Sequence, residues 1–400
     1  MKSETPKVLH KICGRPMIGY VLDLVKSLKP EEKVVVLGHK HELVKKEIAL
    51  GFKLAVQEKL IGTADAVRVA LSKLKGFKGT VLVLYGDTPL LKKETVDKLI
   101  KYHSENGLDA TLLTAELAKP DGYGRIIRDK YFSISSIVEE KDADDFEKNI
   151  KEINTGIICF NKLSLEAALK KVKANNKKRE YYLTDVIKIL YTQGKLVDGI
   201  KIADLNEAMG INSHVELSKA NSIMQSRINE KLMLSGVSIV DPDSTFINYG
   251  TKIGQETVIY PFTVIESDVK IGKRCSIGPF AHLRERARIS DDVTLGNFLE
   301  VVRASIGKKT FAKHFCYIAD TKVGNAVNIG AGSVTANFDG LNKHNTLIKD
   351  GAFIGSDTII VAPVSIGRGA KTGAGSVILK SLPDKKTAVG VPARILKKKG

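Results

Sequence analysis

The stretch Ile253-Gly-Gln-Glu-Thr-Val-Ile259-Tyr-Pro-Phe-Thr-Val-Ile265-Glu-Ser-Asp-Val-Lys-Ile271 places an isoleucine at every sixth position. The same spacing of aliphatic residues runs from Ile247 to Val301 and again from Ile348 to Ile378, where Thr372 is the one exception. A period of six matches neither the 3.6-residue repeat of an α-helix nor the two-residue repeat of a strand. It is typical of the hexapeptide repeats of a parallel β-helix.

In such a fold each hexapeptide makes one short strand and one turn, and three of them close a triangular coil of about 18 residues. The aliphatic residue points into the prism and stacks on its counterpart in the next coil. A glycine often follows it, as in Ile271-Gly272, and we expect this glycine at a sharp corner where a Cβ would be unfavourable. The alternative is a β-sandwich, which would need two-residue alternation and hairpin turns instead.

The six-residue spacing fails at three places. Val301 to Ile306 and Ile318 to Val323 are each one residue short, and the polar segment Asn337–Asn345 interrupts the repeat. This polar segment cannot lie inside a coil, so we expect an extruded loop, and loops on repeat proteins often carry binding surface.

His314 lies between these irregularities, in the segment Phe311-Ala-Lys-His-Phe-Cys-Tyr317. Because it falls between the inward positions Ala312 and Ile318, we expect its side chain to point outward. A lone histidine is usually a surface or structural residue, but this placement also makes His314 a candidate general base.

The chain before residue 206 alternates aliphatic strands with helical stretches. Residues 34–38, 79–85 and 157–160 are candidates for buried strands, and the spacing after Pro16 predicts a helix. A second helix is predicted over 95–102, with Thr95 as its N-cap. Strand–helix alternation favours a parallel-rich, doubly wound, Rossmann-like α/β domain over residues 1–205.

One strand of that domain ends in Tyr85-Gly-Asp87-Thr-Pro89. Ligands in such sheets bind at the carboxyl ends of the strands, so Asp87 could hold Mg²⁺ on a nucleotide phosphate. An aspartate in an ordinary polar turn is the alternative. Helical periodicity after this domain predicts a long helix over 213–234. This helix places a linker at 206–235 and the β-helix domain at 236–400. Asn206 could cap a helix.

The composition limits the classes of partner. Net charge is +18, but the lysines are spread along the chain and the dense run is Lys397-Lys398-Lys399. A solvated lysine-rich surface or anionic small substrates explain this charge without a nucleic-acid partner. No stretch is apolar enough to span a membrane, and the dispersed cysteines indicate free thiols in a reducing cytosol rather than a metal site. They are Cys13, Cys159, Cys275 and Cys316.

A set of short motifs, in this order, resembles the family of bifunctional N-acetylglucosamine-1-phosphate uridylyltransferases / glucosamine-1-phosphate N-acetyltransferases over essentially the whole chain. The motifs are Pro6-Lys-Val-Leu-His10, Gly62-Thr63, Leu84-Tyr-Gly-Asp-Thr-Pro-Leu90, Gly122-Tyr-Gly-Arg125, Glu152-Ile-Asn-Thr-Gly156, Glu180-Tyr-Tyr-Leu-Thr-Asp185, Gly278-Pro-Phe280, Gly296-Asn-Phe-Leu-Glu300, Asn328-Ile-Gly-Ala-Gly332 and Asn337-Phe-Asp-Gly340. The resemblance implies a nucleotide-diphospho-sugar transferase domain followed by a left-handed parallel β-helix, in a cytoplasmic homotrimer.

For the first domain the resemblance implies transfer of UMP from UTP to N-acetylglucosamine-1-phosphate. Asp87 and Asn212 would ligate Mg²⁺. Phosphoryl-type transfer depends on alignment and charge neutralisation more than on a protein nucleophile, so a metal and a cation suit it. The residues implied to line the nucleotide-sugar site are Lys7, Gln57, Gly62, Thr63, Tyr85, Gly124, Glu139 and Asn154.

For the β-helix the resemblance implies acetylation of glucosamine-1-phosphate by acetyl-CoA, with acetylation sites between neighbouring subunits. His314 would be the general base; the ordinary histidine pKa of about 6.5 suits that role near neutral pH. Arg284, Tyr317, Asn328 and Lys343 would contact the amino-sugar phosphate. The residues implied to contact acetyl-CoA are Ala331, Asn337, Phe338, Ser356 and Ala374.

The chain departs from the family pattern in three ways. The family's first strand and Gly-rich loop, which would precede Met1, are missing, so we expect weakened UTP binding unless translation starts upstream. The β-helix is shorter by one to two coils between Asp241 and Gly278, which leaves the repeat in phase. Val302 stands where the family commonly has a phosphate-binding lysine, and Arg303 would face the other way in a regular strand.

Two alternatives to the bifunctional enzyme remain open. One is a nucleotidyltransferase for another sugar phosphate, with the β-helix as a trimerisation or regulatory module. The other is a binding or scaffold protein in which both sites have decayed. The presence of His314, Tyr317, Asp87 and Asn212 argues against the second alternative.

Overall fold

The computed structural model describes residues 1–396, so the run Lys397–Lys399 lies outside the described residues. Contacts divide the chain into two compact units. Unit 1 comprises Met1–Ile12 and Pro16–Ala220, and unit 2 comprises Cys13–Arg15 and Asn221–Gly400. The boundary falls inside helix α8 (His214–Leu234), which confirms the long helix predicted over 213–234.

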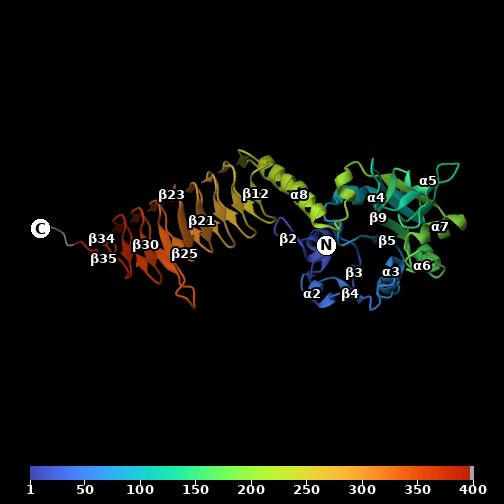
Figure 1. Cartoon of the computed structure of the whole chain (residues 1–400), viewed down its shortest axis with the longest axis horizontal. Coiled ribbons are helices and arrows are strands. Elements are labelled where there is room, and N and C mark those ends of the chain that lie inside the picture. Colours follow the sequence, from blue (N-terminus) through green and yellow to red (C-terminus); the bar gives the residue numbers. More distant parts are fainter. Residues whose placement is uncertain (397–400) are drawn as a thin grey trace. The chain divides into compact units, whose positions relative to one another are not determined.

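Unit 1 contains a main mixed sheet and a separate two-stranded parallel sheet, with helices around them (Figure 1). Its helices are α1 (Met17–Leu28), α2 (His41–Lys45), α3 (Thr63–Leu71), α4 (Lys93–Glu105), α5 (Asp145–Lys148), α6 (Lys162–Leu169) and α7 (Asp185–Thr192), with the 3₁₀ segments η1 (Lys7–Leu9) and η2 (Leu205–Ala208). Its strands are β1 (Lys11–Ile12), β2 (Arg15–Pro16), β3 (Val34–Leu37), β4 (Lys53–Val56), β5 (Thr80–Val83), β6 (Ala110–Glu116), β7 (Arg125–Arg128), β8 (Ile134–Val138), β9 (Glu152–Asn161) and β10 (Val197–Lys201).

The predicted helices and strands of unit 1 are present, but both predicted caps are wrong. The helix predicted over 95–102 is α4, whose N-cap is the extended residue Lys92, so Thr95 lies inside the helix. The backbone N–H of Lys92 donates to Glu207 (2.8 Å), a tertiary contact that residue spacing does not reveal. Asn206 lies inside η2, which is capped by the side chain of Asp204.

The expected parallel-rich sheet is also wrong in its strand directions. The main sheet has the order β10-β6-β9-β7-β8, and β5 pairs with β9. Only β10–β6 within it is parallel, whereas β9 runs antiparallel to β5, β6 and β7. Strand–helix alternation predicts parallel neighbours only when consecutive strands pair, and here β9 enters between β5 and β6 after the β7–β8 hairpin.

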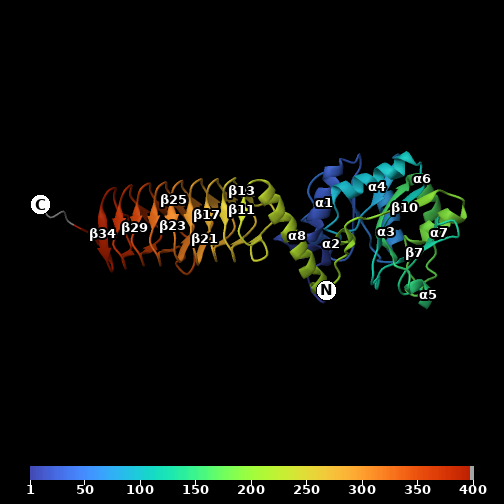
Figure 2. The ribbon, with the colours of Figure 1, turned by 90° about the horizontal axis from the view of Figure 1, so that it is seen from above.

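Unit 2 contains the predicted β-helix, whose coils stack in Figures 1 and 2. Sheet D contains β11 (Ser238–Ile239), β14 (Val258–Ile259), β17 (Ser276–Ile277), β20 (Thr294–Leu295), β23 (Phe311–Ala312), β26 (Asn328–Ile329), β29 (Phe353–Ile354), β32 (Lys371–Thr372), β34 (Thr387–Gly390) and β35 (Ala393–Ile395). Sheet E contains β12 (Phe246–Ile247), β15 (Val264–Ile265), β18 (His282–Leu283), β21 (Leu299–Val302), β24 (Cys316–Ala319), β27 (Val334–Ala336), β30 (Ile359–Val361) and β33 (Val377–Ile378). Sheet F contains β13 (Lys252–Ile253), β16 (Lys270–Ile271), β19 (Arg288–Ile289), β22 (Ser305–Ile306), β25 (Thr321–Val323), β28 (Thr346–Ile348) and β31 (Ser365–Ile366).

The residues of the six-residue repeat form the core of this prism. In sheet E, Ile265 pairs with Leu283, Leu283 with Val301, and Val301 with Ile318, and all four are buried. The short step after Val301 does not break this column, because the corner loses one residue while the inward side chains stay aligned. Burial of a continuous aliphatic column is the main stabilising contribution of such repeat folds.

The glycines after the aliphatic residues lie where a Cβ would be unfavourable, as expected, and Gly254 shows the physical reason. Positive φ angles occur at the third residue after the inward one, at Glu256 (62°), Phe262 (60°) and Asp268 (58°), and not at Gly254. A Cβ on Gly254 would lie 2.6 Å from the carbonyl carbon of Gly272 in the next coil. A Cβ is therefore unfavourable there because the coils approach closely, not because the backbone is left-handed.

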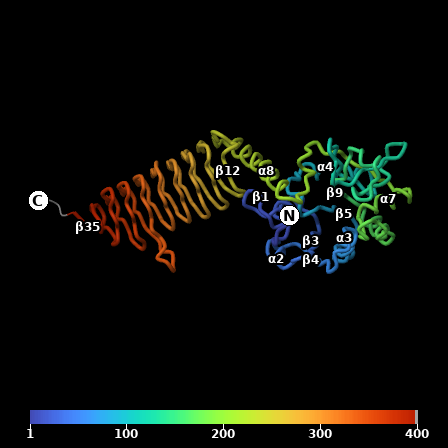
Figure 3. The backbone as a smooth tube through the Cα atoms, viewed as in Figure 1, coloured from blue at the N-terminus to red at the C-terminus, as the bar shows by residue number. Residues whose placement is uncertain are grey.

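The polar segment 337–345 is an extruded loop, as predicted (Figure 3). Ile329 pairs with Ile354 across the coil that carries the loop, whereas Ile348 pairs with Ile366 in the next coil. A bridge between Phe338 and Lys343 closes the loop, and the N–H of His344 donates to the carbonyl of Asn337 (2.7 Å).

Candidate functional sites

Three predicted residues from distant parts of unit 1 meet at one point. The ammonium of Lys7, on η1, contacts the carboxylate of Asp87 and lies 2.7 Å from Oδ1 of Asn212. Asp87 follows β5 in the chain, and Asn212 precedes α8. The side chain of Lys7 is 36% exposed and that of Asp87 20%, so a ligand from solvent can reach this cluster.

Backbone contacts fix the two oxygen-bearing residues of this cluster. The N–H of Ile211 donates to the carbonyl of Asp87 (3.1 Å). The N–H groups of Asn212 and Ser213 donate to the carboxylate of Glu216 (2.6 and 2.7 Å), and the N–H of Glu216 donates back to the Ser213 hydroxyl (3.2 Å). This reciprocal arrangement is a capping box, and it places Asn212 at the start of α8.

The donor set of this cluster fits a magnesium ion. A carboxylate and an amide carbonyl are hard oxygen ligands, and the ammonium of Lys7 already occupies a cation position between them. Within residues 1–396 no group of three or more His, Cys, Asp or Glu side chains could hold a metal by itself. Mg²⁺ is commonly bound by one or two protein oxygens together with substrate phosphates, and this pair matches that pattern.

Gly62 and Thr63 lie at the start of α3, and Gln57, which directly follows β4, contacts this segment. The side-chain amide of Gln57 donates to the carbonyl of Gly62 (3.0 Å), and the hydroxyl of Thr63 accepts from the N–H of Leu183 (3.0 Å). Gly62 has φ of 126°, and a Cβ there would clash with the backbone of Tyr181. Glycine is therefore required at this position for both conformation and space.

The remaining predicted residues of unit 1 form a connected group. The carbonyl of Gly124 accepts from the N–H of Asn154 (2.8 Å), and Oδ1 of Asn154 accepts from the N–H of Gly156 (3.0 Å). The ring of Tyr85 packs on Gly156, where a Cβ would lie 2.7 Å from Cε2. A Cβ on Gly124 would lie 3.1 Å from Cγ2 of Ile137 and 3.5 Å from Oε2 of Glu139, so Gly124 lies beside the Glu139 carboxylate.

Two acidic side chains influence the titration of this group. Burial raises the pKa of the Tyr85 phenol well above its ordinary value, and the charges of Glu139 and Asp87 raise it further. Burial also raises the pKa of the Glu139 carboxyl, although a hydrogen bond from the Thr184 hydroxyl (3.0 Å) opposes this shift. Desolvation of a carboxylate in a polar cleft is common in ligand-binding sites.

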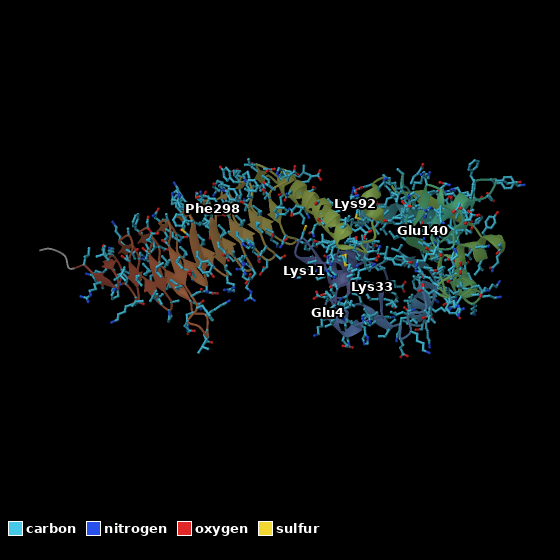
Figure 4. The ribbon with its side chains drawn as sticks, viewed as in Figure 1. Glu4, Lys11, Lys33, Lys92, Glu140 and Phe298 are labelled. Atoms are coloured by element: carbon cyan, nitrogen blue, oxygen red, sulfur yellow. The ribbon has the colours of Figure 1, made fainter. Side chains whose placement is uncertain are left out.

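Gly156 and Thr184 were not among the predicted site residues, although both lie in motifs that carry the family resemblance. Arg125, in another of these motifs, has a structural role: its side chain is 1% exposed and forms an ion pair with Glu140 (2.8 Å). Figure 4 labels Glu140 among the side chains of unit 1. The motif Glu152–Gly156 could have identified Gly156 as a site residue. Only the structure gives the physical reason for a glycine, which is the ring of Tyr85 packed on it.

In unit 2, His314 lies at the corner between β23 and β24, and its side chain is exposed as predicted. Tyr317 lies in β24 and is half-buried. Arg284 follows β18, and its guanidinium donates to Glu300 (2.7 Å), a contact that raises the pKa of Arg284.

Val302 is 1% exposed, so its side chain contacts no ligand from solvent. Arg303 departs from regular strand geometry with φ of 46°. Its guanidinium donates to both carboxylate oxygens of Asp320 (2.7 and 2.8 Å) and to Glu285 (2.8 Å). These contacts raise the pKa of Arg303 and lower that of Asp320. Arg303 is therefore engaged with carboxylates and does not replace a phosphate-binding lysine.

The other predicted residues of unit 2 divide between faces of the prism. Asn328 lies in sheet D between Phe311 and Phe353, whereas Tyr317 lies in sheet E. Asn337 is buried and its amide donates to Asp320, so its side chain faces inward. Lys343 and the exposed Phe338 lie in the extruded loop. Ala331, Ser356 and Ala374 follow β26, β29 and β32 in successive coils, at the corner between sheets D and E.

The same corner carries an exposed aromatic column in the preceding coils. The rings of Phe262, Phe280 and Phe298 stack with centroid distances of 4.8 Å and nearly parallel planes. Their exposed fractions are 54, 44 and 59%. Figure 4 shows Phe298 on the outside of the β-helix. Phe315, next to His314, is exposed at the corresponding corner one coil further on, and a contiguous exposed apolar surface of this kind is typical of an interaction site.

Comparisons with known proteins match both units. The family model for nucleotidyl transferases matches residues 2–204, and the model for the bacterial transferase hexapeptide matches residues 250–285 and 345–380. The bifunctional protein GlmU of Halalkalibacterium halodurans is 43% identical over 96% of this chain and 91% of its own length. That of Thermosipho africanus is 43% identical over 100% of this chain and 95% of its own.

The chain belongs to the GlmU family. Membership confirms the resemblance inferred from the sequence and the order of a nucleotidyltransferase domain and a hexapeptide β-helix. It also makes the chain a bifunctional transferase. Coverage of nearly the full length of GlmU relatives gives no support to the expected weakening of UTP binding, and the missing first strand stays a prediction.

Proposed function

We propose that this GlmU-family chain makes UDP-N-acetylglucosamine by two successive transfers, one in each unit. Acetyl transfer from acetyl-CoA to glucosamine-1-phosphate comes first, and UMP transfer from UTP to the acetylated product follows. The observation that carries this proposal is the convergence of Lys7, Asp87 and Asn212 in a chain that also exposes His314 at a β-helix corner.

In unit 1 a phosphate oxygen of N-acetylglucosamine-1-phosphate attacks the α-phosphorus of UTP, and pyrophosphate leaves. Asp87 and Asn212 would hold Mg²⁺, which when bound neutralises charge on the phosphates. Lys7 contacts the phosphates, and Glu139 and Asn154 position the sugar. The chain therefore supplies alignment and charge rather than a nucleophile.

In unit 2 the amine of glucosamine-1-phosphate attacks the acetyl carbonyl carbon of acetyl-CoA, and the CoA thiolate leaves. His314 removes the proton from the attacking amine as general base. The corner that holds Ala331, Ser356 and Ala374 lies beside His314 in the following coils and suits the extended CoA chain. Lys343 and Tyr317 are proposed to contact the sugar phosphate.

The acetylation site is proposed to form between subunits of a homotrimer. Asn328 on sheet D and Arg284 beside sheet E lie on different faces of one prism, so residues of a second copy would complete the site. The exposed column of Phe262, Phe280 and Phe298 supplies an apolar surface for that contact. Association of such surfaces is driven mainly by burial of apolar area.

The protein is proposed to act in the cytoplasm, where UTP and acetyl-CoA are available. Its four cysteines are free and buried, in agreement with the predicted free thiols. In the described residues no helix is long and apolar enough to cross a membrane.

One observation favours a second candidate, a bifunctional transferase whose β-helix acetylates a different amino sugar. Val302 is buried, and Arg303 forms ion pairs with Asp320 and Glu285. Neither residue therefore supplies the positive charge that the family's lysine gives to the phosphate of glucosamine-1-phosphate.

Two assays on one preparation test the proposal. The first follows CoA release from acetyl-CoA with glucosamine-1-phosphate, and the second follows pyrophosphate release from UTP with N-acetylglucosamine-1-phosphate and Mg²⁺. We expect both activities. Absence of CoA release with this acceptor would leave the second candidate, and absence of pyrophosphate release, also from a chain extended upstream of Met1, would contradict the uridylyl half.

A further inference from the structure

The proposed metal position of unit 1 already contains a positive charge that belongs to the protein. Nζ of Lys7 lies 2.7 Å from Oδ1 of Asn212 and also contacts Oδ2 of Asp87. These are the two side chains that the proposed function assigns to Mg²⁺. One ammonium therefore occupies both protein ligands at once.

A divalent cation and this ammonium cannot share the pair of oxygens. Mg²⁺ requires its oxygen ligands at about 2.0–2.1 Å in octahedral geometry, which leaves no room for an ammonium hydrogen-bonded to the same atoms. Like charges about 4 Å apart in a partly buried site also repel each other strongly. One of the two cations must leave when the other binds.

The geometry indicates that Lys7 is the cation that moves. Asp87 is held through its carbonyl by the N–H of Ile211 (3.1 Å), and Asn212 is held by Glu216 through the capping box of α8. Lys7 instead has a long side chain that is 36% exposed. Its flexible four-carbon stem allows the ammonium to swing toward an incoming phosphate, whereas the backbones of Asp87 and Asn212 are held in place.

We propose that Lys7 is a built-in competitor of the divalent cation, which holds Asp87 and Asn212 in the metal-free protein and releases them when a nucleotide phosphate attracts its ammonium. This proposal rests on the proposed function for the identity of the metal ligands. Its consequence is coupling: phosphate binding and metal binding each favour the other, because both require Lys7 to leave the same two oxygens. The enzyme then binds the metal weakly until the nucleotide is present.

The proposal is tested by direct metal binding without nucleotide, with Mn²⁺ as a paramagnetic probe that electron paramagnetic resonance detects. Lys7→Met removes the charge and keeps the length of the side chain. We expect it to bind Mn²⁺ about tenfold tighter than the wild type, since a charge-assisted contact to a partly buried carboxylate is lost as a competitor. Lys7→Arg keeps the charge, and we expect it to bind Mn²⁺ as weakly as the wild type.

Lys53→Met is the matched control, because Lys53 also forms an ion pair with a carboxylate of unit 1, Glu32 (2.8 Å), but lies away from Asp87 in the chain. We expect it to bind Mn²⁺ like the wild type.

Unchanged affinity in Lys7→Met would overturn the proposal. In the Lys7→Met background, Asp87→Asn should weaken Mn²⁺ binding again. If Asp87→Asn weakens Mn²⁺ binding but Lys7→Met has no effect, Asp87 is a metal ligand and only the competition by Lys7 is wrong. If Asp87→Asn has no effect there, the metal assignment of the proposed function fails as well.

Discussion

The two candidate sites of this protein are built in opposite ways. In unit 1, Lys7, Asp87 and Asn212 come from distant parts of the sequence and meet within one folded unit. In unit 2 the predicted residues are close in sequence, yet Asn328, Tyr317 and Lys343 are distributed over sheet D, sheet E and a loop. A globular sheet brings strand ends together, whereas a β-helix keeps its faces apart because the aliphatic core lies between them.

The charges of the two sites differ in the same way. The Lys7 ammonium contacts Asp87 and Asn212, the proposed metal ligands, so under the proposal its partners change during the reaction. Arg303 and Arg284 are paired with Asp320 and Glu300 and stabilise the fold of one coil on the next. In the proposed function, the uridylyl site is formed by residues of one chain, whereas the acetylation site requires a second copy.

Replacing His314 by Ala gives the largest expected effect and separates the two sites. Loss of a general base typically slows a reaction by about 10²–10⁴-fold, and we expect acetyl transfer to fall by that range. Pyrophosphate release from UTP should stay at the wild-type rate, because His314 belongs to unit 2. CoA release and pyrophosphate release are measured on the same sample. Acetyl transfer at the wild-type rate would show that His314 is only a surface residue.

Replacing Phe280 by Asp tests whether only the β-helix site requires assembly. A carboxylate in the middle of the stacked column should prevent its burial, because an unpaired charge in an apolar contact is strongly unfavourable. We expect the mass in sedimentation to fall toward that of one chain and acetyl transfer to fall by about tenfold or more, while pyrophosphate release is retained. Phe132→Asp, at an 80% exposed phenylalanine of unit 1, is the control. A trimer that persists in Phe280→Asp would remove this column from the interface.

Replacing Asp320 by Asn tests the ionic contacts that set the corner of the β-helix. Arg303 would lose its bidentate partner in a site where Arg303 is 20% and Asp320 12% exposed, and we expect a loss of about 2 kcal/mol in the free energy of unfolding at pH 7. Arg303 lowers the pKa of Asp320 below its unfolded value, so this stability is present above the ordinary aspartate pKa of about 3.9 and is lost as the pH falls below it.

Urea denaturation at pH 7 and at pH 3 measures the difference in the free energy of unfolding between the wild type and Asp320→Asn. This difference should be large at pH 7 and smaller at pH 3. Glu256→Gln, at an exposed corner carboxylate of the same unit, should change stability by less than about 0.5 kcal/mol. An equal difference at both pH values would mean that the charge of Asp320 is not the stabilising feature.

Replacing Glu139 by Gln has the smallest expected effect on stability and tests whether unit 1 holds a desolvated carboxylate for binding. Burial raises the pKa of Glu139 above its unfolded value, so the charged form destabilises the fold at neutral pH, and this effect disappears below pH 4.3 or so. We expect the variant to be more stable by about 0.5–1 kcal/mol at pH 7 and unchanged at pH 4, with slower pyrophosphate release. Scanning calorimetry is the measurement, and the exposed Glu31→Gln is the control; lower stability at pH 7 would contradict the prediction.

Much of unit 2 could be predicted because its contacts repeat along the sequence. The spacing of Ile265, Leu283 and Val301 is enough to identify the inward column, and the interruption at 337–345 identifies the loop. Both predicted caps were wrong, because Thr95 lies inside α4 and Asn206 lies inside η2. Lys92 is the N-cap of α4, and its N–H donates to Glu207, a residue distant in sequence.

The sequence by itself determined the β-helix, its loop and the outward position of His314, because in a repeat fold each coil contacts only its neighbours and the pattern is local. It also indicated Asp87 as a strand-end carboxylate. Only the tertiary structure decided that Lys7 bridges Asp87 and Asn212, that β9 runs antiparallel between β5 and β6, and that Arg303 is engaged with Asp320. These features depend on which distant segments pack together, and local spacing contains no information about that packing.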